Sequence, residues 1–214
     1  FNGDGIDIDS CSDVTVKNCL IGSEDDCIAI KSGRDVEGRR VGIPSKNILI
    51  ENCKFISGFG VAIGSEMSGG VENVTVRDCV FENTFSVASV KPIRPRGGYV
   101  KNITYERCTH KNESLEHEDC LWYRGAIYMD AFHAQEEFDP DTHRPIDEMT
   151  PTVENIVFRD IVSETIAGRG VFLVGAPECP FRGVRMENVR VKGIKEPYIK
   201  NLSDAVMIDT EFTT

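Results

Sequence analysis

Three aspartates near the start of the sequence have the residue type and the spacing that acid–base hydrolysis of a glycoside needs. Asp4 stands alone, and the adjacent pair Asp25 and Asp26 follows 21 positions later. One carboxylic acid can protonate a leaving sugar oxygen while a second carboxylate activates water, and a separation of about 6.5–9.5 Å leaves room for that water and inverts the anomeric centre. Aspartate is also a common turn residue. The catalytic interpretation therefore requires that 21 residues bring the chain back to the same place.

Two short phrases alternate along the chain and supply such a period. The first phrase reads, in successive copies, DVTVKNC (13–19), NILIENC (47–53), NVTVRDC (73–79), NITYERC (102–108), NIVFRDI (155–161) and GVRMENV (183–189). The second lies between copies of the first and reads GIDIDS (5–10), CIAIKSG (27–33), GVAIGSE (60–66), VASVKP (87–92), AIYMDAF (126–132) and GVFLVGA (170–176). The first phrase alternates apolar and polar residues with the period of a half-buried strand, and the second has the length of a strand. The variable segments between them, 34–45, 109–125 and 133–152, are expected to be loops.

Repeated strand pairs without a helical period predict an all-β solenoid of parallel strands, a β-helix of about seven coils. A β-propeller blade would need about 40 residues and four strands, and a sandwich would show hairpin turns such as Asn-Gly, which are scarce here. We therefore expect residues 1–214 to form one parallel β-helix domain. Successive coils of such a fold lie about 4.8 Å apart. Asp4, Asp25 and Asp26 precede equivalent strands, so we expect them at the same corner of neighbouring coils.

Four of the eight cysteines close successive copies of the first phrase, and this position predicts a buried column. They are Cys19, Cys53, Cys79 and Cys108. A free cysteine is a good small core residue, and residues at one place in successive coils stack on each other. We expect these four side chains to be stacked, buried thiols and not disulfide partners.

The bulk composition argues against some partners. The formal net charge is −11 at pH 7, whereas nucleic acid needs a basic face. The sequence contains no run of 18 apolar residues, so no membrane span is predicted. Positive charge is concentrated in VKPIRPRGG (90–98), together with Arg39 and Arg40. The chain opens on Phe1 without a visible signal peptide, and we interpret it as a fragment, a processed form or a trimmed chain whose compartment the sequence leaves open.

The stretches NGDGIDIDS, EDDCIAIKSG, GFGVAIGSEMSGG and SVKPIRPRGGYVKNI, in this order, resemble glycoside hydrolase family 28, the polygalacturonases and related pectin hydrolases. The resemblance covers nearly the whole chain and is most specific over residues 2–103. It implies a right-handed, single-stranded parallel β-helix that hydrolyses an α-linked galacturonic-acid polymer, with no cofactor or metal. Asn2 and Asp4 match the family's Asn-Thr-Asp motif, with Gly3 in place of Thr, and Asp25 and Asp26 match its Asp-Asp motif. By this resemblance Asp25 is the general acid, and Asp4 with Asp26 holds the water.

Two positions that handle the substrate differ from the family pattern. Phe59 stands in GFG where the family has a His that tunes the carboxylates. Ser89 stands in SVK where the family has an Arg, although Lys91 of that motif remains. The family's Arg and Lys grip a substrate carboxylate, and an Arg is hard to replace at a bidentate site. Arg94 and Arg96 on the same loop are candidates to reach in. The predicted substrate-binding residues are Asn2, Lys31, Phe59, Ser89, Lys91, Arg94 and Arg96.

Other polar and aromatic residues carry weaker signals. Lys31, Ser65 and Glu66 lie at the ends of second-phrase strands, where they face either a substrate groove or solvent. Tyr128 and Trp122 could stack on sugar, but we expect them to be packing residues. The four histidines lie in the long segments without metal-ligand spacing and are expected at the surface: His110, His117, His133 and His143. Only His133 directly follows a second-phrase strand, which makes it the exception to watch.

Two functions of different classes remain open. The first is an active inverting hydrolase with altered handling of the substrate carboxylate, for example on rhamnogalacturonan or another decorated pectin. The second is a catalytically weak or inactive β-helix that binds pectic sugar or serves as an assembly scaffold. Members of the family usually carry several more coils before the Asn-Thr-Asp motif. The first coil here would therefore present an open end, and we expect a homo-oligomer that covers it.

Overall fold

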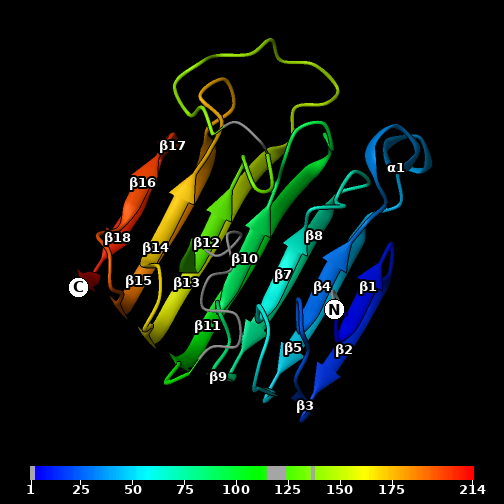
Figure 1. The fold of residues 1–214 in the computed structure, drawn as a ribbon. Helices are drawn as coiled ribbons and strands as arrows, with labels where there is room; N and C mark the ends of the chain where they lie inside the picture. The colour runs from blue at the N-terminus through cyan, green and yellow to red at the C-terminus, as the bar shows by residue number, and fades with distance from the viewer. Residues whose placement is uncertain (1–2, 115–123, 136–137) are drawn as a thin grey trace.

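Two parallel sheets, wound as one right-handed β-helix, form most of the regular structure in the computed structural model, which describes residues 3–114, 124–135 and 138–214 (Figure 1). The first sheet contains, in spatial order, β1 (Ile6–Asp9), β4 (Ile28–Lys31), β7 (Val61–Gly64), β10 (Ala88–Lys91), β12 (Gly125–Asp130), β14 (Arg169–Val174) and β16 (Tyr198–Lys200). The second contains, again in spatial order, β2 (Ser12–Lys17), β5 (Ser45–Glu51), β8 (Val71–Arg77), β11 (Tyr99–Lys111), β13 (Thr152–Glu164), β15 (Phe181–Lys192) and β17 (Leu202–Ser203). Five shorter strands belong to the same second sheet but lie off this order: β3 (Leu20–Ile21), β6 (Lys54–Phe55), β9 (Val80–Glu82), β18 (Val206–Ile208) and β19 (Glu211–Thr213).

The register follows the repeated phrases, so each coil stacks like residues on like. In the first sheet, Ile6 lies opposite Ile28, Ile28 opposite Val61, Val61 opposite Ala88, and Ala88 opposite Ile127. These side chains point into the core, because successive residues of a strand alternate between its two faces. The pairs between named strands are parallel throughout the described residues. The predicted parallel β-helix is therefore confirmed.

An asparagine ladder lies near the start of the strands of the second sheet. Asn47 donates from its side-chain amide to Asp13 at 2.9 Å, and Asn73, Asn102 and Asn155 each donate to the preceding member at 3.3, 3.1 and 3.2 Å. All five residues have φ between 56° and 59°. Asn and Asp tolerate this left-handed conformation better than other residues with a side chain. The repeated first residue of the phrase, Asn or Asp, therefore fixes both the local turn of the backbone and the stacking of one coil on the next.

A row of alternating charges crosses the outer face of the same sheet. Glu51 lies opposite Arg77, Arg77 opposite Glu106, Glu106 opposite Arg159, and Arg159 opposite Glu187. The nitrogen–oxygen distances are 2.7 Å for Glu51 with Arg77 and 2.6 Å for Arg159 with Glu187. Opposite charges on neighbouring strands stabilise the register, whereas like charges would destabilise it. Each pair is partly exposed and contributes about 1 kcal/mol or less.

The cysteine column forms as predicted except at its first member. Cys53, Cys79 and Cys108 are buried free thiols, but Cys19 is only half-buried. Backbone hydrogen bonds join the coils beside this column. The Lys54 N–H donates to Cys19 O at 2.9 Å, and equivalent bonds join the following coils. Cys19 belongs to the coil of β2, which is at the margin of its sheet. Among the described residues, a covering coil therefore lies on one side of it.

The sequence predicted that the segment 34–45 is a loop. The structure shows instead that this segment contains the short helix α1 (Asp35–Val41). The helix has acidic residues in its first turn and Arg39 and Arg40 in its last turn, which complements the helix dipole. It ends at Gly42, whose φ of 62° is readily adopted by glycine. Among the described residues, no helix is both long and apolar enough to cross a membrane.

The expectation of a surface position for His110 is wrong. His110 is 3% exposed, because β11 continues beyond the repeated phrase and pairs His110 with Phe81 on one side and Ser163 on the other. The ring Nε2 lies 2.9 Å from Thr84 O and Nδ1 lies 2.7 Å from Ser163 Oγ. Since a carbonyl can only accept, Nε2 carries the proton and Nδ1 accepts from the serine hydroxyl.

Candidate active site

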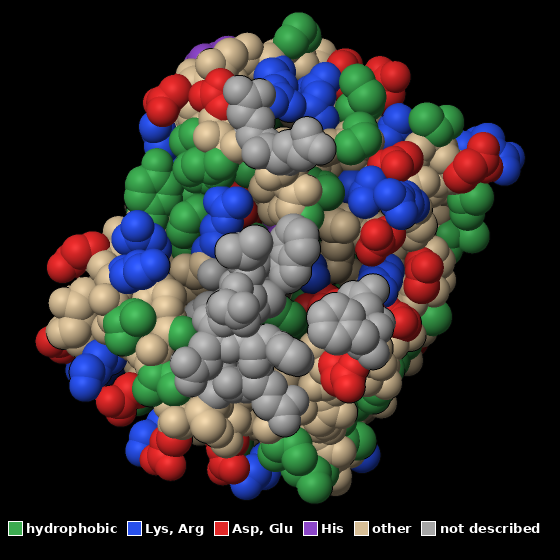
Figure 2. Space-filling model, viewed as in Figure 1, with side chains coloured by type: hydrophobic (Ala, Val, Ile, Leu, Met, Phe, Trp, Pro, Cys, Tyr) green, Lys and Arg blue, Asp and Glu red, His purple; other side chains and the backbone are tan. Residues whose placement is uncertain are grey.

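A groove of about 910 Å³ lies against the outer face of the first sheet. Its lining includes outward-facing residues of β1, β4, β7, β10 and β12 and of the turns that precede and follow these strands. Outward positions lie in register across the sheet, so Asp7, Ala29, Ala62, Ser89 and Tyr128 form one row. Figure 2, seen from the same side as Figure 1, shows acidic and basic side chains mixed on this face. The repeat that builds the sheet therefore also positions the groove residues.

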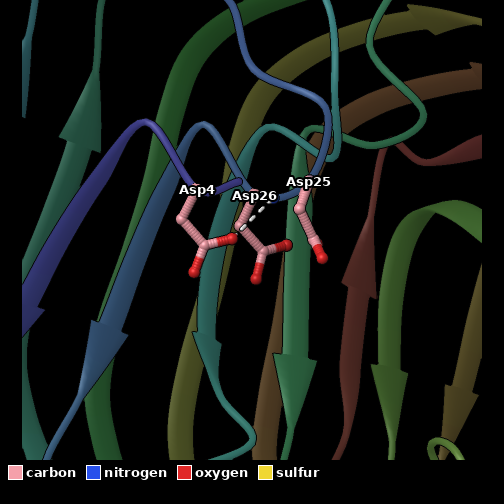
Figure 3. A group of neighbouring side chains, drawn as sticks. All are labelled: Asp4, Asp25 and Asp26. Carbon is pink, nitrogen blue, oxygen red and sulfur yellow. Dashed lines mark hydrogen bonds between the residues drawn. The ribbon is translucent and has the colours of Figure 1, made fainter. Parts of the chain in front are cut away.

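The three predicted aspartates lie together at the corner that precedes β1 and β4. One carboxylate oxygen from each of Asp4, Asp25 and Asp26 lies within 4.8 Å of the others. Figure 3 shows the three carboxyl groups pointing the same way from neighbouring turns. Asp4 Oδ1 accepts a hydrogen bond from the Asp26 backbone N–H at 3.2 Å, and the Gly5 N–H donates to Asp26 O at 2.9 Å. β1 pairs with β4 at an offset of 22 residues, so Asp4 lies one coil before Asp26, and Asp25 is the residue next to that position.

Two lysines from different coils hold two of these carboxylates. Lys31 Nζ lies 2.7 Å from Asp4 Oδ2 and 2.6 Å from Asp7 Oδ1. Lys91 Nζ lies 2.6 Å from Asp26 Oδ2. Burial alone would lower the pKa of Lys31, but the hydrogen bonds and charges of Asp4 and Asp7 outweigh it and raise that pKa. Lys31 and Lys91 were both predicted to face substrate, and both reach the groove through contacts with the acidic cluster.

Asp26 is the most perturbed of the three carboxylates. It is 3% exposed. Burial raises its pKa to about 6, against the lowering effect of Lys91, and the charges of Asp25 and Asp4 add to the rise. Its second oxygen, Oδ1, is buried and accepts no hydrogen bond from any described residue.

Three carboxylate oxygens within 4.8 Å of one another also resemble the ligand set of a hard cation. In this chain, however, Lys31 and Lys91 already place ammonium groups on Asp4 and Asp26. Positive charge at the cluster is thus supplied by the protein's own side chains.

The two substituted family positions, Phe59 and Ser89, both line the groove. Phe59 stacks on Phe85 with ring centroids 4.7 Å apart and an interplanar angle of 17°. Ser89 Oγ lies 2.8 Å from Ser86 Oγ, and Ser86 Oγ also donates to the Phe59 carbonyl. This part of the groove is consequently an aromatic ring beside small hydroxyls, without a cationic side chain on either residue.

Arg94 and Arg96 do not reach into the groove, contrary to the sequence-based expectation. Arg94 turns away onto the segment that precedes β13, where it donates to Thr150 Oγ1 at 2.7 Å and pairs with Asp147. Arg96 is 6% exposed, and its Nη1 lies 2.6 Å from Asp35 Oδ1 at the start of α1. Both guanidinium groups are occupied by carboxylates from other segments, which fixes their direction. The cation missing at Ser89 is therefore not replaced from this loop.

Other residues singled out in the sequence fall into three groups. Ser65 and Glu66 line the groove. His143 is exposed, as expected. The remaining residues lie outside the described part of the chain: Asn2, His117 and Trp122.

The far end of the groove contains a polar cluster that the sequence analysis largely missed. Arg124, Tyr128 and His133 line it, and buried Asp130 lies beneath them. Tyr128 was expected to be a packing residue, although it lies opposite Ser89 in the register. His133 was the histidine flagged by its position after a second-phrase strand. Arg124 is an isolated arginine before β12, and only the register of that strand could have located it.

Comparison with known proteins places this geometry in a family. The profile described as "Glycosyl hydrolases family 28" matches residues 1–119. The chain belongs to glycosyl hydrolases family 28. The carboxylate cluster, Phe59, Ser89 and Lys91 all lie within the part that matches family 28.

Individual relatives agree with this assignment. A "Probable polygalacturonase" of Vitis vinifera is 35% identical over 192 residues, which are 89% of this chain and 36% of that protein. An "Endo-polygalacturonase" of Pectobacterium carotovorum subsp. carotovorum is 29% identical over 94% of this chain and 43% of its own length. The crystal structure of a hyperthermoactive exopolygalacturonase from Thermotoga maritima superposes with a TM-score of 0.77 at 27% identity, covering 97% of this chain and 44% of that one. The chain thus spans less than half the length of these family 28 relatives.

Proposed function

We propose that this chain carries the catalytic groove of a glycoside hydrolase that acts on pectic, galacturonic-acid-containing polysaccharide or oligosaccharide. The observation that carries the proposal is the cluster of Asp4, Asp25 and Asp26, with Asp26 buried, its pKa raised to about 6 and its Oδ1 without a described partner. A structural turn would not need three carboxylates within 4.8 Å of one another, because stacked like charges oppose ionisation. Perturbed carboxylates in a groove are typical of acid–base catalysis.

The proposed roles follow the family 28 resemblance. Asp25 gives its proton to the glycosidic oxygen as the carbon–oxygen bond breaks. Asp4 and Asp26 hold a water, whose oxygen attacks the anomeric carbon while its proton passes to one of the two carboxylates. The products are a shortened chain and a sugar with a new reducing end.

Inversion at the anomeric carbon is part of the proposal and needs its own measurement. The cluster's 4.8 Å limit joins the nearest oxygens, whereas the ranges of about 5–5.5 Å for retaining and 6.5–9.5 Å for inverting enzymes describe the separation of whole carboxyl groups. Proton NMR of the first-formed product decides directly, and a first product that retains the substrate's configuration would sink the water-holding role of Asp4 and Asp26.

A substrate with a better leaving group can distinguish the residue that acts as the general acid from the two that act as bases. An aryl galacturonide with a good leaving group needs little acid assistance, because the departing phenolate is stable without a proton. Asp25→Asn should therefore lose polymer hydrolysis by about 10²–10⁴-fold yet keep most of its activity on the aryl substrate. Asp4→Asn and Asp26→Asn should lose both activities. Rescue of Asp26→Asn instead of Asp25→Asn would exchange the roles.

The second candidate function is a catalytically weak or inactive β-helix that binds pectic sugar or serves as a scaffold. The observation favouring it is that Phe59 and Ser89 line the groove where the family has His and Arg. One experiment distinguishes the two candidate functions. The chain is incubated with a panel of pectic oligosaccharides, including rhamnogalacturonan fragments, and the masses of the products are measured by mass spectrometry. Binding without any product supports the second function and rejects the first.

A further inference from the structure

The cluster at the far end of the groove is built as a hydrogen-bonded chain from a buried carboxylate outward. Asp130 is fully buried. Its Oδ1 accepts from the Phe132 backbone N–H at 2.8 Å, and its Oδ2 accepts from the Tyr128 hydroxyl at 3.0 Å. Asp130 is thereby fixed in place, and it orients the tyrosine ring that lines the groove.

This chain also fixes the tautomer of His133. Tyr128 has one hydroxyl proton, which it gives to Asp130, so its oxygen can only accept from His133 Nδ1 at 2.7 Å. Burial, together with the charges of Lys91 and Arg124, lowers the pKa of His133 to about 3. The ring is therefore neutral, with the proton on Nδ1 and a lone pair on Nε2. Within the described part of the chain, nothing donates to Nε2.

Arg124 is positioned beside this histidine by its face and by an ion pair from one of its nitrogens. Its guanidinium lies 4.7 Å from the Phe138 ring centroid and 5.2 Å from that of Phe172. Its Nη1 is 3.4 Å from Asp130 Oδ2, an oxygen already bonded to Tyr128. No described residue accepts a hydrogen bond from the guanidinium, and the side chain is 26% exposed. A stacked guanidinium keeps its in-plane N–H groups free for a carboxylate.

The other cations of the groove are less available. Lys31 and Lys91 lie within 2.6–2.7 Å of carboxylates of the acidic cluster or its neighbour Asp7. Arg34 is 67% exposed at the rim. Arg124 is therefore the groove cation, among the described residues, that is both ordered by its neighbours and left with free donors.

We infer that Arg124 and His133 form a distal uronate subsite, in which Arg124 donates to the carboxylate of a sugar residue and His133 Nε2 accepts from one of its hydroxyls. This inference rests on the proposed pectic substrate. The coil of β12 lies three steps from the coil of β4 that carries Asp25 and Asp26. Three steps of about 4.8 Å amount to roughly 14 Å. With the backbones this far apart, we place the bound sugar beyond the two at the cleaved bond, where the subsite recognises acid charge without a cation at Ser89.

The test compares binding of an acidic and a neutral ligand to the full 214-residue chain. The probes are tetragalacturonate and the corresponding galactose tetramer, measured by calorimetry at fixed ionic strength. Arg124→Met should weaken tetragalacturonate binding by about 10- to 100-fold, the range for one charge-assisted hydrogen bond, and leave the neutral tetramer within about twofold. Arg124→Lys should fall between, since it keeps the charge without the planar fork. Arg40→Met, an exposed arginine on α1, is the matched control and should change neither.

The histidine has a spectroscopic readout that a merely structural role would not produce. The ¹⁵N shifts of His133 should report the Nδ1–H tautomer, and ligand binding should move the Nε2 resonance. Tyr128→Phe should release the tautomer preference while the thermal midpoint shows whether the fold is kept. A wild-type ring protonated on Nε2, or an unchanged acid preference in a folded Arg124→Met variant, would overturn the inference. If binding depends on Arg124 but no cleavage occurs, the subsite is supported and the hydrolase function is rejected. If the chain cleaves its substrate but binding does not depend on Arg124, the hydrolase function is supported and the subsite is rejected.

Discussion

Lys91 holds Asp26 from two coils away, with Nζ 2.6 Å from Oδ2 and both side chains at most 10% exposed. The lysine retained from the family motif thus contacts the carboxylate cluster itself. Without this ammonium, burial and the neighbouring Asp25 and Asp4 would push the pKa of Asp26 above its value of about 6. Lys91 therefore sets how much of Asp26 is ionised near neutral pH.

The first prediction is an acidic limit to activity at about pH 6. A base must be ionised, and Asp26 has a pKa raised to about 6, so kcat/KM should fall as the pH drops through that value. In Lys91→Met the fall should begin at a higher pH, because the charge and the hydrogen bond of Lys91 lower the pKa of Asp26. A pH series of kcat/KM on the best oligosaccharide measures both.

The control for this series is Lys101→Met, which removes a half-buried lysine paired with Glu72 on the other sheet. It should leave the profile unchanged. Activity that falls above pH 6, instead of below it, would mean that Asp26 acts as the acid. An unshifted profile in Lys91→Met would show that the pair does not control the titration.

The second prediction concerns the substituted positions Phe59 and Ser89. The missing contact to a substrate carboxylate should cost roughly 2–4 kcal/mol of transition-state binding, about 30- to 1000-fold in rate. Plain polygalacturonate should therefore be cleaved weakly, and Phe59→His with Ser89→Arg should recover part of that factor in a reducing-sugar assay. Ser65→Arg adds a cation elsewhere in the same groove and should not. Robust cleavage by the unmodified chain would mean that other residues supply the contact.

The third prediction concerns thiol reactivity along the cysteine column. Burial raises the pKa of Cys79 and of Cys108 from 9.0 to about 12, and the thiolate is the reacting form. In the native chain, exposed Cys11 should be alkylated first, half-buried Cys19 next, and Cys79 and Cys108 last. Peptide mapping by mass spectrometry after timed alkylation gives the order. The same mapping on denatured, unreduced protein should find all of them modified, and an oxidised column would contradict the stacked-thiol arrangement.

Much of the fold could be predicted from the sequence because its determinants are local and repeated. The alternation of apolar residues in the first phrase fixes which face is buried, and the cysteine that ends four of its six copies marks one position in successive coils. The same reasoning placed Asp4 one coil before Asp25 and Asp26. The edge position of Cys19, the helix inside 34–45 and the burial of His110 depended on what surrounds them.

The rest of the site depended on contacts between distant segments. The direction of Arg94 is set by Thr150 and Asp147, more than 50 residues later. Arg124 carries no motif, and its place in the groove follows from the strand pairing of β12. Association of copies through the first coil stays a prediction that light scattering across a concentration series can test.

The fourth prediction is that acid destabilises this fold through its buried histidines. Burial lowers the pKa of His110 to about 4 and that of His133 to about 3, against an ordinary value of 6.5. The unfolded chain then binds more protons than the folded one, so stability is lost as the pH falls below about 6.5 and continues to fall until the folded-state pKa is passed. From pH 7.5 to 5.5, His110 alone should cost about 1.3 kcal/mol.

Asp26 acts in the opposite direction, because its pKa is raised in the fold, so its contribution grows as the pH falls from about 6 towards 3.8. The cleanest measurement is therefore a comparison of variants. Urea unfolding of the chain and of His110→Gln at pH 7.5 and 5.5 should show His110→Gln less stable at pH 7.5, by about 1–3 kcal/mol for the disturbed bonds to Thr84 and Ser163. The variant should nevertheless lose about 1.3 kcal/mol less between the two pH values, because glutamine does not titrate. Equal pH dependence in both proteins would show that His110 titrates alike in the folded and unfolded chain, and that its buried, neutral state does not govern acid stability.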